Sequence, residues 1–166
     1  DYEVTIIDYS QPALDTLRDH PKIKKRQGSV LDLDFVTDIV GDADIVCGVL
    51  PSQLEGPAQK RVIEMGKDFV SPSGFLNAEG LDDLARAKGV TAVFDMGVAP
   101  GMSNYLVARG AHMLDRLERG VIYVGGIPTK LDPPFNYRTV FCLEDTLNEY
   151  VAPARCAENG VLTEAP

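Results

Sequence analysis

Strand-like and helix-like segments alternate along the first two thirds of the chain, joined by short connections. β-Branched and apolar residues fill residues 3–8, 44–50 and 90–94, and apolar residues recur at helical spacing after each of these segments. Such alternation is typical of βα units, in which the strands run parallel and helices cover the sheet. The sequence therefore predicts an α/β fold with a mainly parallel sheet.

The alternation stops near Gly120. Residues 121–125 and 137–141 have the composition of strands, and a loop that contains several Pro and Gly residues separates them. A helix pattern with Leu143 and Leu147 on one face follows. We therefore predict two domains, a parallel-sheet domain over residues 1–118 and the beginning of an α+β domain over residues 119–166.

The charge and the cysteines exclude several classes of protein. Lys and Arg number 16 against 25 Asp and Glu, and this net charge of −9 argues against nucleic acid and anionic membranes as partners. No apolar run approaches the ~18 residues that a membrane span needs. The three cysteines lie far apart, which suits a cytoplasmic protein and predicts neither a disulfide framework nor a metal site.

Asp8 ends the first predicted strand, directly before a helix that Ser10 is expected to cap. In a doubly wound sheet, ligands bind at the carboxyl ends of the strands, where an acid accepts the two ribose hydroxyls of an adenosine. The same charge repels a 2′-phosphate, and neither Tyr9 nor Ser10 is a cation. Asp8 therefore favours NAD over NADP, unless it only caps the helix that follows.

Two further groups follow predicted strands. Asp32 is a candidate to lie against the edge of the adenine ring, and the alternative is that it caps the helix around Phe35. The end of the strand at 44–50 would run under the cofactor, although a proline there also simply ends a strand. This second group of candidate cofactor-binding residues is Val49, Leu50 and Pro51.

The segment DMGVAPGMSN, residues 95–104, joins the strand at 90–94 to a long helix expected to end at Gly120. Glycines permit close approach of the backbone, and free N–H groups at a helix N-terminus favour a carboxylate or a polarised carbonyl. The alternative is a tight turn without a ligand. The candidates for cofactor binding are Gly97, Val98 and Ala99, and those for substrate binding are Pro100, Gly101 and Met102.

The chain contains no G-x-G-x-x-G motif. That motif precedes the ribose-binding acid by about 20 residues, whereas seven residues precede Asp8. If Asp8 reads the ribose, we expect the first strand and the glycine loop to lie outside these residues, so that the chain is a fragment. Neither His20 nor His112 has a Cys, Ser or acidic residue at a spacing that indicates catalysis, and no catalytic residue is assigned.

The segments VFDMGVAPGMSNYLVARG (93–110) and YVGGIPTKLDPPFNYRTVFCLEDTLNEYVAPARCAENG (123–160) resemble the saccharopine dehydrogenase-like family. The resemblance is closest to its lysine 6-dehydrogenase and saccharopine dehydrogenase branch and covers nearly the whole chain. It implies a Rossmann-like domain that lacks its first strand and its glycine loop. It also implies that the opening of a substrate or dimerisation domain follows, truncated after Pro166. Residues 69–74, FVSPSG, depart from the family, because Ser71 stands where an acid is expected.

The resemblance implies an NAD(P)-dependent oxidoreductase that acts on the CH–NH or CH–NH2 group of an amino acid such as lysine or saccharopine. The alternative is a non-catalytic binding or assembly domain derived from this family. Since the pyrophosphate-binding loop is missing, we expect this chain alone to bind NAD weakly or not at all and to be inactive. Strand edges left without a neighbour favour a homo-oligomer or exchanged segments.

Overall fold

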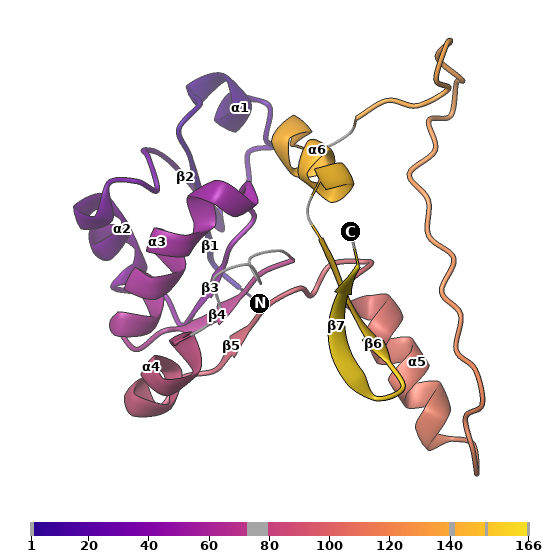
Figure 1. Ribbon diagram of the computed structural model, residues 1–166. Coiled ribbons are helices and arrows are strands. Elements are labelled where there is room, and N and C mark those ends of the chain that lie inside the picture. Colours follow the sequence, from indigo (N-terminus) through magenta and orange to yellow (C-terminus); the bar gives the residue numbers. More distant parts are fainter. Residues whose placement is uncertain (1, 73–79, 140–141, 152, 166) are drawn as a thin grey trace. The chain divides into compact units, whose positions relative to one another are not determined.

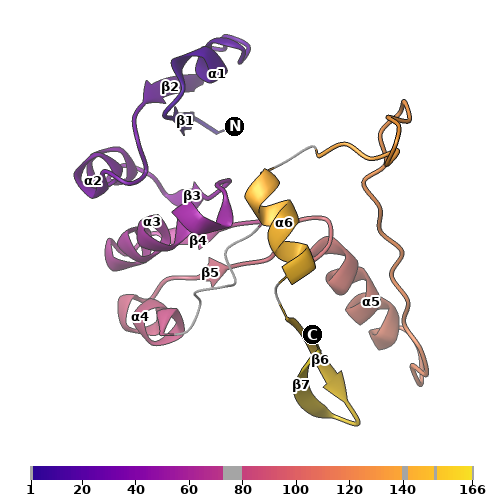
Figure 2. The ribbon, with the colours of Figure 1, turned by 45° about the horizontal axis from the view of Figure 1, so that its top comes forward.

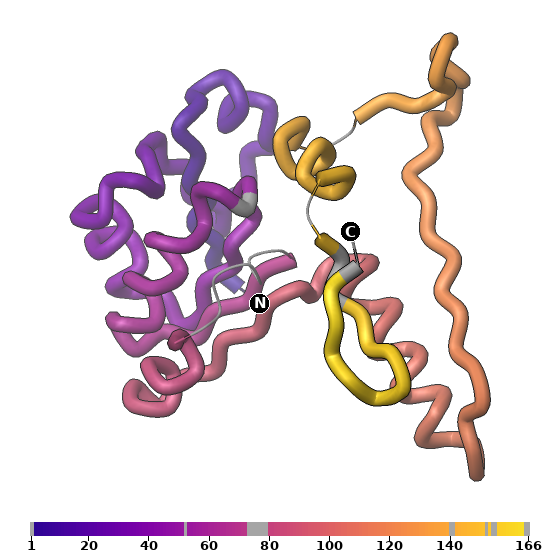
Figure 3. Tube along the Cα trace, viewed as in Figure 1, coloured from indigo at the N-terminus to yellow at the C-terminus, as the bar shows by residue number. Residues whose placement is uncertain are grey.

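The structure is a computed structural model of the 166-residue chain, and it describes residues 2–72, 80–139, 142–151 and 153–165. The chain divides into two compact units, Asp1–Gly120 and Val121–Pro166. Figure 3 traces the chain through the two units in turn. Figure 1 labels the helices and strands of each unit.

The first unit begins with a two-stranded parallel sheet. Strand β1 (Val4–Asp8) pairs with β2 (Ile23–Gln27), so that Asp8 lies opposite Gln27. Helix α1 (Gln11–Asp15) joins the two strands, and the Ser10 hydroxyl caps it by accepting from the Ala13 N–H, as predicted. This part of the chain is therefore one βαβ unit.

A three-stranded parallel sheet follows, in the order β3, β4, β5. Helices α2, α3 and α4 precede the three strands or connect them, and Figure 2 shows the three helices side by side. The bounds are α2 Leu33–Val40, β3 Ile45–Cys47, α3 Ser52–Glu64, β4 Asp68–Val70, α4 Leu81–Lys88 and β5 Ala92–Val93.

The hydrophobic core lies between these helices and β4. Val36 and Val40 of α2 and Val62 of α3 pack with Phe69 of β4, whose ring centroid is 5.8 Å from that of Phe94. A second cluster of Ile63, Leu81 and Ala85 joins α3 to α4. The apolar residues that recur at helical spacing therefore do face the sheet, which fixes the three strand ends relative to one another.

The expected α/β class with parallel strands is confirmed, and the parallel strands of this unit form two small sheets. β1 pairs with β2, and β3 pairs with β4, while β1 and β3 are not hydrogen-bonded to each other. In addition, β3 ends at Cys47 rather than at residue 50. Just beyond the strand, the Gly48 N–H donates to the Val70 carbonyl (2.9 Å).

Three predictions for the region after β5 are wrong. Helix α5 (Met102–His112) ends well before Gly120, and residues 121–125 form no strand. Residues 137–139 form no strand either, while residues 140 and 141 of that prediction lie outside the described residues. An apolar composition does not make a strand without a neighbour to satisfy its backbone groups, and no described strand pairs with these segments.

The second unit holds helix α6 (Leu143–Val151), as predicted, and a hairpin that the sequence analysis missed. Its strands, β6 (Ala154–Glu158) and β7 (Val161–Ala165), pair antiparallel around Asn159 and Gly160. Both turn residues have positive φ, 51° and 81°. Asn-Gly between two extended segments is a strong hairpin signal and could have predicted this element.

Candidate functional site

The loops after β3 and β5 flank the end of β4. The Gly48 N–H donates to the Val70 carbonyl (2.9 Å), and the Ser71 N–H donates to the Val93 carbonyl (2.9 Å). The Met96 N–H then donates to the Ser71 carbonyl (3.0 Å), which ties the segment after β5 to the end of β4. The predicted groups at 49–51 and 97–102 thus follow strands of one sheet at its carboxyl-end edge.

The turn between β5 and α5 closes on itself. Gly97 and Gly101 form a β-bridge, the Met102 N–H donates to the Gly97 carbonyl (2.9 Å), and the Ser103 N–H donates to the Val98 carbonyl (3.0 Å). The Gly101 N–H donates to Asn104 Oδ1 (3.1 Å). The expectation of free N–H groups at this helix end is therefore wrong for Gly101, Met102 and Ser103.

Gly101 is the residue on which the shape of this turn depends. It is buried and has φ 121°, a conformation that L side chains rarely adopt. A Cβ there would lie 2.5 Å from the Gly97 carbonyl oxygen and 2.7 Å from that of Asp95. Glycine is thus required, whereas Val98, Ala99 and Pro100 are exposed and form the accessible part of the turn.

The loop after β3 leads straight into helix α3. Val49 is 74% exposed, and Pro51 is the N-cap residue, whose carbonyl accepts from the Leu54 N–H (2.9 Å). The simpler interpretation, that the proline ends the strand, is wrong, because β3 already ends at Cys47, four residues before Pro51. Val49 and Leu50 follow β3 at the carboxyl-end edge, where the predicted cofactor would run.

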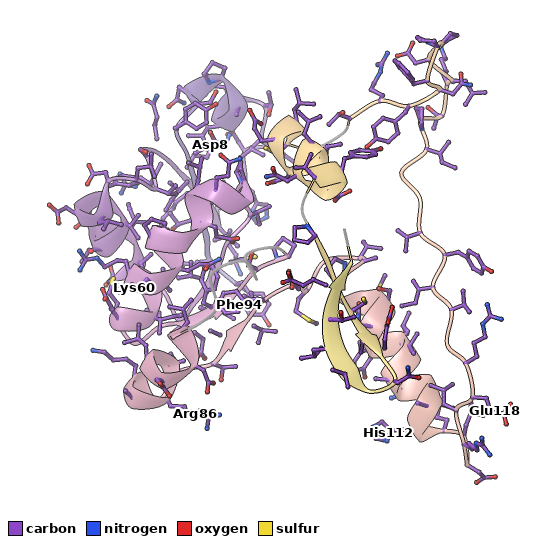
Figure 4. The ribbon with its side chains drawn as sticks, in the orientation of Figure 1. Asp8, Lys60, Arg86, Phe94, His112 and Glu118 are labelled. Atoms are coloured by element: carbon purple, nitrogen blue, oxygen red, sulfur yellow. The ribbon has the colours of Figure 1, made fainter. Side chains whose placement is uncertain are left out.

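Asp8 lies at the end of β1, beside helix α1 (Figure 4). Its Oδ1 accepts from the Ser10 N–H (2.8 Å), and its carbonyl accepts from the Gly28 N–H (3.0 Å). The other carboxylate oxygen has no partner within the described ranges, so it can accept from a ligand. The alternative that Asp8 caps the helix is not observed, because Ser10 is the N-cap residue of α1 and Asp8 only accepts from its N–H.

Asp32 is the N-cap residue of α2. Its Oδ1 accepts from the N–H groups of Asp34 and Phe35, both at 3.1 Å. The capping alternative is thus observed, and contact with an adenine stays a prediction. Asp32 and Asp8 follow strands of the two-stranded sheet, whereas the other predicted residues follow strands of the three-stranded sheet.

Replacing Asp32 by alanine is expected to lower the free energy of unfolding by about 1 kcal/mol, because two N–H groups of α2 lose their acceptor. The matched control is Asp32→Asn, which keeps a capping oxygen and is expected to change the stability by less than half as much. Urea unfolding measures both variants. An unchanged stability in Asp32→Ala would show that the cap contributes nothing.

Sequence reasoning missed a buried polar cluster, which consists of Glu55, Gln59 and Ser71. Glu55 and Gln59 stand at helical spacing from the buried Ala58 and Val62, so the face of α3 that bears them could have been recognised. Their polarity concealed them, because Glu and Gln are mostly exposed in proteins.

The remaining charged and histidine residues suggest no site. Among the described strands, β2 pairs with β1 alone, and its basic residues are typical of a protected edge. Lys25 bonds to Asp19 (2.7 Å) and lowers the pKa of that carboxyl. His112 is exposed at the end of α5 (Figure 4). In the described ranges no group of metal-ligating side chains occurs and no helix is long and apolar enough to cross a membrane.

Comparison with known proteins finds similarities that include a distant one to alpha-aminoadipic semialdehyde synthase. The chain is 23% identical over 160 residues to alpha-aminoadipic semialdehyde synthase from Arabidopsis thaliana. The matched region is 92% of this chain and 15% of that protein, so the chain spans a small part of the length of its relative. No protein-family model matches the chain.

Proposed function

We propose that this chain forms part of an NAD(P)-dependent oxidoreductase that acts on the CH–NH or CH–NH2 group of an amino acid such as lysine or saccharopine. The distant similarity to alpha-aminoadipic semialdehyde synthase and the resemblance of residues 93–110 and 123–160 to the saccharopine dehydrogenase-like family support this proposal. The observation that carries it is the arrangement of the loops after β3 and β5 at one carboxyl-end edge of a parallel sheet.

The residues present fit part of a dinucleotide. Asp8 keeps one carboxylate oxygen for the ribose, and the loops at 49–50 and 97–99, in which Val49, Val98 and Ala99 are exposed, offer a surface for the rest of the cofactor. When bound, the nicotinamide exchanges a hydride with the carbon that bears the amine. This chain's part is to orient the cofactor through Asp8 and the two loops, and to hold the substrate near Pro100, Gly101 and Met102.

The same arrangement favours NAD over NADP. The Asp8 charge opposes a 2′-phosphate, and neither neighbour in sequence, Tyr9 or Ser10, is a cation that could offset it. The pyrophosphate needs a further element, since no G-x-G-x-x-G occurs among the 166 residues.

We also propose that β1 and β3 receive a further strand, from the rest of the polypeptide or from a second copy in a homo-oligomer. Among the strands that the structure describes, each of them has one neighbour. Neither β1 before Asp8 nor β3 carries a charged residue, whereas β2 carries Lys24, Lys25 and Arg26. Edge strands that stay free are normally protected by such charges, so the unprotected edges favour a partner.

The second candidate is a non-catalytic binding or assembly domain. The missing glycine motif and the lack of an assignable acid–base residue favour it. The two candidates differ in turnover, which the oxidoreductase must show and the assembly domain must not.

The test uses the 166-residue chain and the polypeptide that its gene encodes in full. We expect titration calorimetry to detect no micromolar NAD binding by the 166 residues. We expect the full polypeptide to bind NAD and to reduce it in the presence of an amino acid with an oxidisable amine. Micromolar binding by the 166 residues would contradict the need for a glycine loop, and binding without turnover by the full polypeptide would favour the assembly domain.

A further inference from the structure

Three polar side chains are buried where α3 packs against the end of β4. Glu55 is 1% exposed, and Gln59 and Ser71 are both 0% exposed. Polar groups are costly to bury unless they are hydrogen-bonded, and an apolar packing would avoid that cost. Their presence therefore calls for an explanation other than the packing of the core.

Glu55 and Ser71 are bonded to each other directly. The Ser71 hydroxyl donates to Glu55 Oε1 (2.5 Å). Gly48, the residue after β3, leaves room for this carboxylate, since a Cβ there would overlap Glu55 Oε1. The carboxylate thus meets β3, β4 and α3 at a single point.

Both residues of this pair connect to the loops of the proposed cofactor site. The Ser71 carbonyl accepts from the Met96 N–H (3.0 Å), at the start of the turn that contains Gly97 and Gly101. Glu55 lies in the first turn of α3, one helical turn after Pro51. The pair is therefore one hydrogen bond away from the turn at 95–101 and one helical turn away from the loop at 49–51.

Gln59 extends the buried polar face by one more turn of α3. Its Oε1 and Nε2 are buried and have no hydrogen-bond partner within the described ranges. Leaving a buried amide unsatisfied is unfavourable by about 1–3 kcal/mol. Such a cost is typical of a functional site rather than of a core that is selected for stability alone.

We propose that Glu55 and Ser71 are positioning residues: their hydrogen bond sets the spacing between the loop at 49–51 and the turn at 95–101. The inference rests on the proposed function only in naming these two loops as the place of the cofactor. The pair itself contacts no reacting atom. It acts through the backbone of Ser71 and through the N-terminus of α3.

The first test needs no cofactor and uses the 166-residue chain. Ser71→Ala is expected to shift the NMR signals of the backbone amides of Leu50 and of residues 96–101, because the hydrogen bond that sets the spacing of the two loops is lost. Val62→Ala is the matched control: this side chain is buried on the same helix, and its truncation lowers stability without removing a hydrogen bond. Loop signals that do not move in Ser71→Ala, or that move as much in Val62→Ala, would overturn the proposal.

Conservative variants separate the hydrogen bond from mere packing. Glu55→Gln keeps an oxygen that can accept from the Ser71 hydroxyl, so we expect its loop signals to stay close to those of the parent chain. Glu55→Ala removes the acceptor, and we expect it to reproduce the shifts of Ser71→Ala. Equal effects of the glutamine and alanine variants would assign the role to packing and contradict the proposal.

The second test measures NAD binding by the polypeptide that the gene encodes in full. Ser71→Ala is expected to raise the Kd about tenfold, the effect of one lost buried hydrogen bond, while Val62→Ala leaves the Kd within about twofold. An unchanged Kd in Ser71→Ala would contradict the positioning role. If the parent polypeptide binds no NAD at all, the proposed function fails, and the amide signals alone decide whether the pair positions the loops.

Discussion

Replacing Phe69 by alanine is expected to lower the free energy of unfolding by about 3 kcal/mol or more. Phe69 is 3% exposed and packs in the cluster that joins α2 and α3 to β4. Its ring also lies against Phe94 and over Gly48. Truncation leaves a cavity that these neighbours cannot fill without moving the strand ends.

Urea unfolding measures this effect, and Phe135→Ala is the matched control. Phe135 is 85% exposed, so its truncation is expected to change the stability by less than about 0.5 kcal/mol. A loss below about 1 kcal/mol for Phe69→Ala would mean that the clusters around β4 are not the core of the first unit.

Replacing Gly101 by alanine is expected to open the turn between β5 and α5. The residue has φ 121°, and a Cβ would overlap the backbone of Gly97 and Asp95. Strain at such a φ and overlap with fixed atoms each cost about 1–3 kcal/mol, so the closed turn becomes about a hundredfold less favourable. The bonds that the Met102 and Ser103 N–H groups make to the turn are then lost for much of the time.

Amide hydrogen exchange at Met102 and Ser103 measures this loss directly. We expect the protection of these two amides to fall about a hundredfold in Gly101→Ala. The control is Gly110→Ala in the interior of α5, where a Cβ meets nothing within 4 Å and helix propensity improves. Unchanged protection in Gly101→Ala would show that the turn tolerates a side chain and that its glycine has no structural role.

The sequence predicts those parts of the fold whose signal is local. The Ser10 cap and the apolar spacing of α2, α3 and α4 each depend on a few neighbouring residues, and the structure contains them. Residues 121–125 show the limit of such reasoning, because a strand depends on a partner that the segment itself does not specify.

The positions of the candidate site residues could be predicted from the sequence, but their hydrogen bonds could not. The strand-end positions of Asp8, Val49 and Gly97 follow from the βα pattern alone. Which N–H groups stay free in the turn depends on the positive φ of Gly101, which a motif does not reveal. Glu55, which accepts from the Ser71 hydroxyl, lies on the buried face of α3, where the rule that charged residues are exposed gives the wrong answer.

The central claim is that Asp8 reads the ribose of NAD in an oxidoreductase to which this chain contributes. The most direct test compares NAD and NADP binding by the full gene-encoded polypeptide and its Asp8→Asn variant. The variant removes the charge but keeps an oxygen that can accept from the Ser10 N–H. Asp15→Asn, an exposed acid on α1, is the control for the change in net charge.

We expect the parent polypeptide to prefer NAD, and we expect Asp8→Asn to weaken NAD binding about tenfold while NADP binding strengthens or stays the same. The control should leave both affinities unchanged. A parent polypeptide that prefers NADP, or an Asp8→Asn variant with the cofactor preference of the parent, would contradict the account.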